Sequence, residues 1–174
     1  MSVPVVETAR LRLSRLSPEA DDDADFVLRQ LNDPGFIRFI ADRGVRSLDD
    51  ARAYIRNGPA TSYARHGHGL YRVSLKDGTP VGLCGLLRRE GLDAPDLGYS
   101  LLGEFTGRGY AAEAAAAVLA DGRERLGLAR ILAIVDPDNA ASIRLLRKLG
   151  FGSATMTRLH GIDHDVQLFV LEAE

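Results

Sequence analysis

Several features are scarce in this chain of 174 residues, and each absence excludes a class of protein. A single cysteine, Cys84, excludes an internal disulfide, and its apolar neighbours in residues 81–86 indicate a buried structural thiol rather than a nucleophile. The formal net charge of −2 lacks the positive excess with which proteins usually bind nucleic acids or membrane surfaces, so we expect neither as a partner. Because the chain shows no secretory signal and no apolar run of membrane-spanning length, we expect it in the cytoplasm.

Repeats, low-complexity tracts and long linkers are absent as well. A chain of this length buries enough surface to fold without disulfides or structural metals. The hydrophobic fraction of 45% and the charged fraction of 26% are ordinary for a soluble globular protein. We therefore expect one domain over residues 1–174.

Local patterns in the first half of the chain predict a strand followed by helices. Residues 8–13 alternate polar and apolar side chains, as in a half-buried strand. Residues 18–32 form the first predicted helix, and the aspartates near its start favour the helix dipole, which indicates a solvated helix end rather than a metal site. A second helix is predicted to begin at Ser47, because Ser47 and Asp50 have capping-box-like spacing.

Further strands and helices follow in the second half. Two strands within residues 70–87 flank an Asp77-Gly78 turn, and residues 97–102 form the next strand. The remaining predicted elements are a helix that ends near Gly127, a strand over residues 131–135, a helix from Asn139 to Gly150, and two strands within residues 151–171. The predicted order is βααβββαβαββ, a mixed α/β sheet with helices on its faces.

The most informative segment is residues 105–114 (FTGRGYAAEA), which leads from a glycine loop directly into an alanine-rich helix. Gly107 and Gly109 lack a Cβ, so the backbone there can turn sharply and approach a ligand closely. The amides of the loop and of the first helical turn have no partner within the helix and lie at the positive end of its dipole. Such a site attracts a phosphate or pyrophosphate.

The loop also fits a dinucleotide-binding fold. Gly107, Gly109 and Ala112 match the fingerprint G-x-G-x-x-A, and Asp136 ends the following strand, where a ribose-binding acid belongs. A dinucleotide-binding domain needs several parallel β-α units, however, and only one follows the loop. A Walker loop is excluded because no Lys-Ser or Lys-Thr pair ends the glycine segment. A dinucleotide-binding oxidoreductase remains as an alternative from another class.

A second block lies downstream, in residues 138–151 (DNAASIRLLRKLGF). The two blocks, in this order and at this separation, resemble the GNAT superfamily of N-acetyltransferases. Further segments resemble its RimJ/RimL-type branch, which acetylates protein amino termini, notably of ribosomal proteins; these are residues 7–11 (ETARL), 97–99 (LGY), 107–114 (GRGYAAEA) and 139–144 (NAASIR). The resemblance covers nearly the whole chain. It implies a GNAT-type α/β (α+β) fold with a mixed, mostly antiparallel sheet, helices on both faces, and acetyl-CoA (coenzyme A) as cofactor.

The resemblance also implies roles for individual residues. The backbone amides of the glycine loop hold the pyrophosphate, and the Arg108 side chain either adds charge there or remains a solvated loop residue. The pantetheine arm pairs with the strand edge at residues 100–102, and the Leu102 amide stabilises the oxyanion, a role whose loss raises a barrier by about 2.7–4 kcal/mol. Asn139 binds the cofactor arm, caps its helix, or does both. The implied cofactor-binding residues are Ser100, Leu101, Leu102, Gly107, Arg108, Gly109, Tyr110, Ala111, Asn139 and Ser142.

The departing thiolate requires a proton donor. Many superfamily members place a tyrosine for this purpose seven residues after the asparagine, but here that position is Leu146. Ser142 faces the same region in the RimL-like pattern, so Ser142 is the candidate donor, with helix capping as its structural alternative; Ser142 and Leu102 are thus the implied catalytic residues. The superfamily needs no metal, and two histidines in one loop, His66 and His68, are weak grounds for a metal site.

The acceptor is expected to be a primary amine, in the first place the α-amine of a protein or peptide N terminus. An α-amine with a pKa of about 7.7–8.0 is appreciably neutral at physiological pH, whereas a lysine amine near about 10.4 is not, so a weak base suffices. Variable loops within residues 43–69 and 160–165 are expected to line the acceptor cleft. The candidate bases are His160, Asp163, His164 and Asp165, the last of which also suits a structural hydrogen bond. A small-molecule amine (polyamine, antibiotic or amino acid) as acceptor, a non-catalytic acyl-CoA-binding module, and either a monomer or a homodimer remain open.

Overall fold

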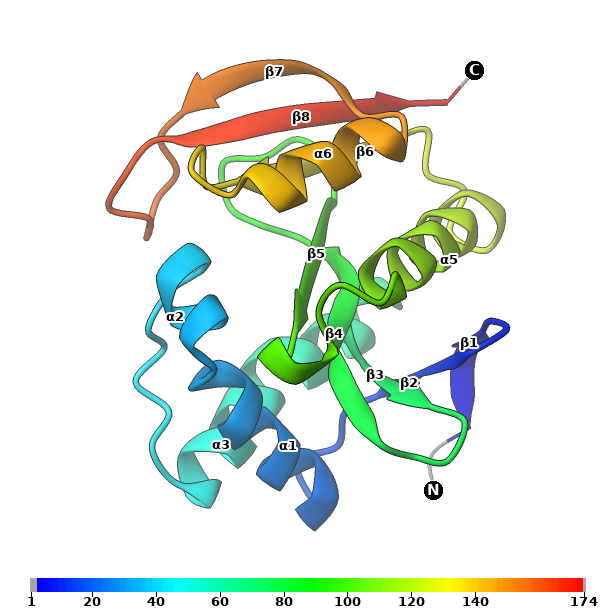
Figure 1. The fold of residues 1–174 in the computed structure, drawn as a ribbon, viewed down its shortest axis with the longest axis vertical. Helices are drawn as coiled ribbons and strands as arrows, with labels where there is room; N and C mark the ends of the chain where they lie inside the picture. The colour runs from blue at the N-terminus through cyan, green and yellow to red at the C-terminus, as the bar shows by residue number, and fades with distance from the viewer. Residues whose placement is uncertain (1–2, 174) are drawn as a thin grey trace.

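The computed structural model describes residues 3–173, in which an eight-stranded sheet carries helices on both faces (Figure 1). The strand order is β1-β2-β3-β4-β5-β6-β8-β7, and neighbouring strands are antiparallel except β5 and β6. The strands are β1 (Pro4–Glu7), β2 (Leu11–Arg15), β3 (Leu70–Leu75), β4 (Pro80–Leu87), β5 (Asp96–Leu101), β6 (Arg130–Val135), β7 (Gly152–Thr157) and β8 (Val166–Glu172). The helices are α1 (Asp21–Leu31), α2 (Pro34–Phe39), α3 (Leu48–Ile55), α4 (Thr61–His66), α5 (Tyr110–Glu124) and α6 (Ala140–Lys148), with a π-helical turn η1 (Arg56–Ala60) and a 3-10 turn η2 (Gly103–Phe105). The predicted mixed, mostly antiparallel fold is confirmed.

The parallel pair β5 and β6 is the feature that positions the site. β5 keeps its register with β4 over its whole length, from Asp96 to Leu101. Its pairing with β6 is limited to Asp96 and Leu132. The two strands therefore diverge beyond that point, and β5 presents an edge to the space between them.

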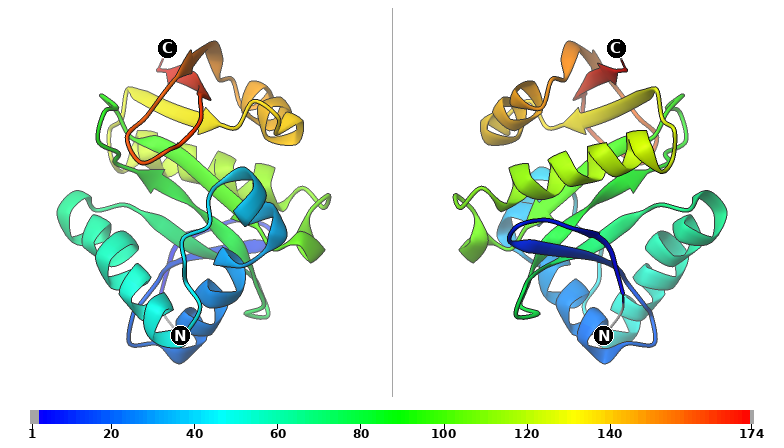
Figure 2. Two further views of the ribbon diagram at one scale, coloured as in Figure 1. Left: turned by 90° about the vertical axis from the view of Figure 1, so that its left-hand side faces the viewer. Right: turned by 90° about the vertical axis from the view of Figure 1, so that its right-hand side faces the viewer.

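Two apolar cores lie on opposite faces of the sheet. The first contains Val118 of α5 and Leu146 of α6, together with the inward side chains of the strands. The second contains Phe26 of α1 and Ile55 of α3. Figure 2 shows α5 lying across one face, while α1 and α3 cover the other. The diverging strands are thus held between two separately packed layers.

The start of the chain differs from the prediction. Of residues 8–13, predicted as one strand, residues 8–10 form the turn between β1 and β2 and residues 11–13 belong to β2. The Thr8 amide donates to the Leu11 carbonyl at 3.0 Å, and the Thr8 hydroxyl accepts from the Leu11 amide, also at 3.0 Å. The alternation of polar and apolar residues runs unbroken through this turn, and for that reason the sequence pattern did not reveal it.

The helical region before β3 is also more divided than predicted. α2 was not predicted; Asp33 caps it by accepting a hydrogen bond from the Gly35 amide at 3.0 Å. Ser47 caps α3 as predicted, since its hydroxyl accepts from the Asp50 amide at 3.0 Å. The helix then passes through the π-helical turn η1 before α4 begins. Pro59 lies inside η1 and has no amide hydrogen to donate to the helix.

Candidate active site

The exposed edge of β5 is set by the alternation of its backbone hydrogen bonds. The Leu102 amide donates to the Val81 carbonyl at 2.9 Å. Bonding groups alternate along an antiparallel pair, so the amides of Leu101 and Tyr99 point away from β4, toward β6. Because β6 has diverged at this height, these two amides face an open strand edge.

This geometry corrects the role expected for Leu102. Its amide is engaged by β4, and its side chain is buried in the core beneath α1. The outward-facing amide belongs to the preceding residue, Leu101. A slip of one residue in strand register reverses which groups face outward, and register is not visible in the sequence.

Ser100 faces the opposite side of the sheet from its neighbours on β5. Its hydroxyl accepts a hydrogen bond from the Gln30 side chain of α1 at 3.0 Å. Gln30 is fully buried, and its Oε1 atom has no partner among the described residues. The Ser100 side chain therefore anchors α1 to β5, and its backbone groups face β4, in phase with those of Leu102.

The glycine loop adopts the conformation that its sequence predicts. Gly107 and Gly109 have φ angles of 77° and 82°, in the left-handed region that residues with a Cβ rarely adopt. Gly109 precedes the first turn of α5, and no side chain caps that turn. The amides of Tyr110 and Ala111 therefore remain available for an anion at the positive end of the helix dipole.

The turn between β1 and β2 braces this loop. Glu113 of α5 accepts hydrogen bonds from the Thr8 hydroxyl at 2.5 Å, the Arg10 amide at 3.0 Å and Arg10 Nε at 2.7 Å. Arg10 Nη1 donates to the Arg108 carbonyl at 2.9 Å, and its guanidinium lies over the Tyr110 ring. Partial burial raises the pKa of Glu113, but the hydrogen bonds from Thr8 and Arg10 outweigh it and hold the pKa below its usual value. The sequence prediction missed this contact, although the ETARL segment and Glu113 were both part of the resemblance.

Arg108 itself is exposed, and its guanidinium carbon lies 5.8 Å from the centre of the Phe105 ring. It forms no ion pair with the part of the chain that the structure describes. This position is compatible with either of the two roles expected for it.

Asn139 and Ser142 lie at the start of α6, beside β5. The Asn139 side chain caps the helix by accepting from the Ser142 amide at 3.2 Å. The Ser142 hydroxyl lies 2.5 Å from the Tyr99 hydroxyl, and Tyr99 also donates to the Ser142 carbonyl at 3.3 Å. Burial raises the pKa of Tyr99 to about 12, although the hydrogen bond with Ser142 opposes this rise. Tyr99 is therefore a protonated donor at neutral pH.

Tyr99 is the polar residue at this site that sequence reasoning missed. Leu97, Tyr99 and Leu101 alternate with small or polar residues on β5 and share the core under α5 and α6. This period of two would have placed the Tyr99 hydroxyl toward α6. Leu146, which occupies the position of the expected tyrosine, is 1% exposed and packs into the same core.

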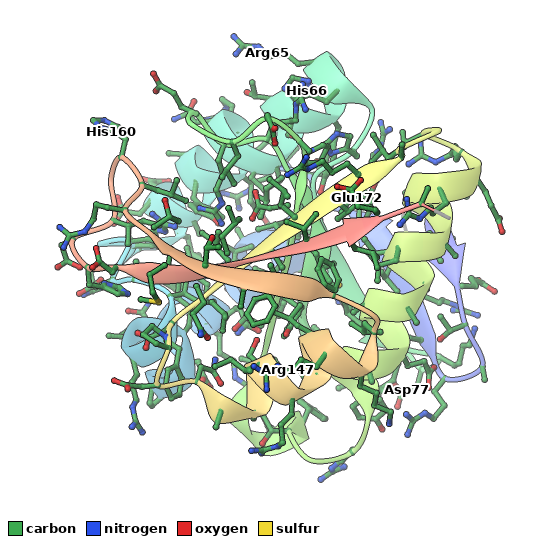
Figure 3. The ribbon with its side chains drawn as sticks, turned by 90° about the horizontal axis from the view of Figure 1, so that it is seen from above. Arg65, His66, Asp77, Arg147, His160 and Glu172 are labelled. Atoms are coloured by element: carbon green, nitrogen blue, oxygen red, sulfur yellow. The ribbon has the colours of Figure 1, made fainter. Side chains whose placement is uncertain are left out.

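Three of the four candidate bases in the loop between β7 and β8 have polar partners. His164 has Nδ1 2.8 Å from Asp163 and Nε2 3.4 Å from Asp136, so both ring nitrogens face a carboxylate. Asp165 pairs with Arg158 at 2.9 Å. The remaining candidate, His160, is exposed and points away from the body of the protein in Figure 3.

Asp96, at the point where β5 and β6 meet, is the buried carboxylate of this region. Arg89 Nε lies 3.0 and 3.2 Å from its two oxygens. Burial raises the pKa of Asp96, and the charge of Arg89 opposes this rise. The carboxylate is thus held in a structural ion pair.

Of the two histidines before β3, His68 has a structural role. His68 is buried, its Nδ1 lies 2.9 Å from the Leu86 carbonyl, and its ring stacks on His66. Burial lowers the pKa of His68. Within residues 3–173 no three histidine, cysteine or acidic side chains gather as a metal-ion site. Among the same residues, no helix combines the length and the apolar character needed to cross a membrane.

β5 diverges from β6, presents outward-facing amides and leads into a glycine loop before the uncapped start of α5. An extended thioester that carries a pyrophosphate fits this arrangement. The class of protein with such a site is the acyl-CoA-dependent acyltransferases. A single parallel pair in the described sheet also excludes the doubly wound dinucleotide fold, so that alternative is wrong. The family model described as "Acetyltransferase (GNAT) domain" matches residues 10–152. The chain belongs to the GNAT acetyltransferase family and is an acyltransferase that uses acetyl-CoA.

Known proteins resemble the chain over most of its length. It is 29% identical over 174 residues to the uncharacterized N-acetyltransferase YoaA of Bacillus subtilis, with 95% of each chain covered. It is 28% identical to the uncharacterized N-acetyltransferase p20 of Bacillus licheniformis, covering 87% of this chain and 84% of that protein. Among solved structures, an acetyltransferase from Agrobacterium tumefaciens superposes with a TM-score of 0.77 at 24% identity, covering 99% and 96% of the two chains. RimL, a ribosomal L7/L12 alpha-N-protein acetyltransferase in complex with coenzyme A, superposes with a TM-score of 0.80 at 18% identity over 98% of each chain.

Proposed function

We propose that the protein transfers the acetyl group of acetyl-CoA to the α-amine of a protein or peptide N terminus. The observation that carries this proposal is the state of the ionisable groups near the diverging strands. Asp96 and Asp165 pair with arginines, and both ring nitrogens of His164 face carboxylates, so these candidate bases beside β5 already have polar partners among the described residues. An α-amine, whose pKa is about 7.7–8.0, needs little help to be neutral, whereas a lysine amine needs much more. The structural similarity to RimL supports the same acceptor class.

Two backbone features fit acetyl-CoA. The amides at Gly107, Arg108, Gly109, Tyr110 and Ala111 would hold its pyrophosphate at the uncapped start of α5. The edge of β5 at Ser100, Leu101 and Leu102 would pair with its pantetheine arm, with Tyr99 and Leu101 supplying the outward-facing groups. When bound, acetyl-CoA supplies the activated thioester. The Leu101 amide would then donate to the thioester carbonyl oxygen as negative charge develops there, in place of the Leu102 amide.

The hydroxyl pair of Ser142 and Tyr99 would move the proton. Ser142 Oγ would give its proton to the departing sulfur, and Tyr99 Oη, 2.5 Å away, would restore it. The proton that the acetylated amine releases to solvent would balance the one that Tyr99 then regains from solvent. Asn139 fixes this arrangement by capping α6, so that the Ser142 backbone cannot rotate away from β5. The capping and catalytic roles of this segment are therefore compatible.

A peptide library with free amino termini, incubated with protein and acetyl-CoA, tests the proposal by mass shift. We expect acetylation at the α-amine, no transfer to lysine side chains of N-terminally blocked peptides, and a large loss of turnover for Ser142→Ala with unchanged acetyl-CoA binding by calorimetry. Transfer confined to small amines such as polyamines would overturn the proposed acceptor class. Retention of full turnover by Ser142→Ala would remove the assignment of the proton donor.

A further inference from the structure

We propose that a groove along α3, η1 and α4 binds the acceptor and prefers a peptide whose first residues are acidic. This inference rests on the proposed function and specifies its acceptor. The groove consists of two adjoining cavities of about 400 and 260 Å³ that share Tyr54, Asn57 and Gly58. Most of its lining falls within residues 43–69, where the sequence predicts a loop of the acceptor cleft, and Leu70, Leu87 and Arg88 complete it. A run of several residues in extended form fits such a groove better than a single small amine does.

Basic side chains outnumber acidic ones in the lining of the groove. Arg43 lines the larger cavity, and Arg65, His66 and Arg88 line the smaller one. None of these four side chains forms an ion pair with another residue in the described range 3–173. Arg65 and His66 are exposed on α4, where Figure 3 labels them, and no carboxylate of the described residues pairs with either. Carboxylates of a ligand would find these donors unoccupied, and cationic ligands would be repelled.

The other polar groups of the groove strengthen this preference. Asp50 is the acidic residue among those lining the cavities, and its Oδ2 atom already accepts from the Arg46 amide at 3.0 Å. Tyr54 and Asn57, which carry a hydroxyl and an amide, line both cavities. Burial raises the pKa of Tyr54, which keeps its hydroxyl a neutral donor. The lining is therefore rich in hydrogen-bond donors, as a site for carboxylates requires.

The groove adjoins the reacting edge of β5. Leu70 and Leu87 line the smaller cavity and pack over Gly98 on β5: a Cβ at Gly98 would lie 2.7 Å from Leu87 Cδ1 and 3.6 Å from Leu70 Cδ2. Gly98 immediately precedes Tyr99, whose amide faces the open edge. Leu87 is also the register partner of Asp96, where β5 and β6 meet. An acceptor amine at the diverging strands can thus leave its following residues in the groove.

Charge-matched peptides test the inference. The set shares one N-terminal residue and continues with acidic, neutral or basic residues, and kcat/KM is measured at low and high ionic strength. We expect the acidic peptides to exceed the basic ones by about tenfold or more at low salt, with the ratio shrinking at high salt because exposed charges are screened. The acetyl-CoA KM should not depend on the peptide.

Variants of the groove locate the effect. Arg65→Gln with Arg88→Gln should lower kcat/KM for acidic peptides by about fivefold to tenfold through KM, and Arg88→Glu should shift the preference toward basic peptides. Arg56→Gln is the matched control, because Arg56 is exposed on the same helical segment but lines neither cavity. Circular dichroism and acetyl-CoA calorimetry verify that each variant is folded.

The outcomes separate this inference from the proposed function. Equal transfer to acidic, neutral and basic peptides, or a charge preference that Arg88→Glu leaves unchanged, would overturn the acidic groove while peptide acetylation stands. Acetylation of small amino dicarboxylates alone would overturn the peptide acceptor. Absence of transfer to every peptide, with acetyl-CoA still bound, would remove the proposed function and the inference together.

Discussion

Removing the Glu113 carboxylate is expected to destabilise the protein and weaken acetyl-CoA binding together. Glu113 accepts three hydrogen bonds from Thr8 and Arg10, at 2.5, 3.0 and 2.7 Å. A hydrogen bond to a charged group contributes about 1.5–3 kcal/mol when shielded from solvent. The Arg10 side chain is 46% exposed and that of Glu113 is 21% exposed, so solvent screening reduces the sum strongly. For Glu113→Ala we expect a loss of about 2–3 kcal/mol in the free energy of unfolding.

Thermal unfolding and calorimetry measure the two effects. For a protein of this size about 1 kcal/mol corresponds to about 2–4 °C, so Tm should fall by about 4–12 °C. Arg10 also holds the Arg108 carbonyl, so the loop should lose its preorganised form and the acetyl-CoA Kd should rise about tenfold. Glu7→Ala is the matched control, because Glu7 forms only exposed ion pairs near the same turn. A Glu113→Ala protein that melts within about 1 °C of the parent and binds acetyl-CoA equally well would refute the reasoning.

The same carboxylate gives the prediction a pH dependence. The pKa of Glu113 is lowered in the folded state, so its ionised form is the stabilising one. This contribution is fully present above the ordinary value of 4.5 and is lost as the pH falls through the folded-state pKa. The difference in Tm between the parent and Glu113→Gln should therefore be constant near neutral pH and shrink below pH 4.5. A difference that grows on acidification would contradict this sign.

Three further substitutions test the site. Tyr99→Phe should lower kcat about tenfold to a hundredfold with unchanged acetyl-CoA affinity, as measured by steady-state kinetics and calorimetry, because it removes the hydroxyl that serves Ser142. Leu101→Pro removes an outward-facing amide that β4 does not use, so kcat should fall about 10²- to 10³-fold while circular dichroism remains native. Gly109→Ala forces a Cβ onto a residue with φ of 82° and places it 3.2 Å from Arg10 Nη2, so acetyl-CoA affinity should drop about tenfold. Gly152→Ala, at an open position with ordinary φ, should leave that affinity unchanged.

Local chemistry explains why much of the fold was predictable from the sequence. The conformation of Gly107 and Gly109, the cap at Ser47 and the buried strand at residues 131–135 each depend on a few neighbouring residues. Each of these signals describes one element at a time. Added together, they give the order of most helices and strands, while β1, α2 and α4 left no separate signal.

Contacts between distant segments were not predictable in this way. The Arg10–Glu113 contact joins residues 103 positions apart, and the Tyr99–Ser142 contact joins residues 43 positions apart. Both depend on how a turn or a helix docks onto the sheet. The role given to Leu102 failed for a related reason: the register between β4 and β5 decides which amides face outward, and no residue of β5 encodes it alone.

The position of Leu146 shows how one chemical requirement can be met from another element. A tyrosine at that position would bring a hydroxyl from α6 toward the cofactor, but Leu146 packs into the core. Here the phenol comes from β5 instead, because Tyr99 points toward α6 and meets Ser142 at its first turn. Tyr99 gives Ser142 a proton donor at 2.5 Å, and the pair then regains one proton from solvent through Tyr99. Neither hydroxyl is sufficient by itself, so substituting both Tyr99 and Ser142 should reduce turnover by much less than the product of the two single effects.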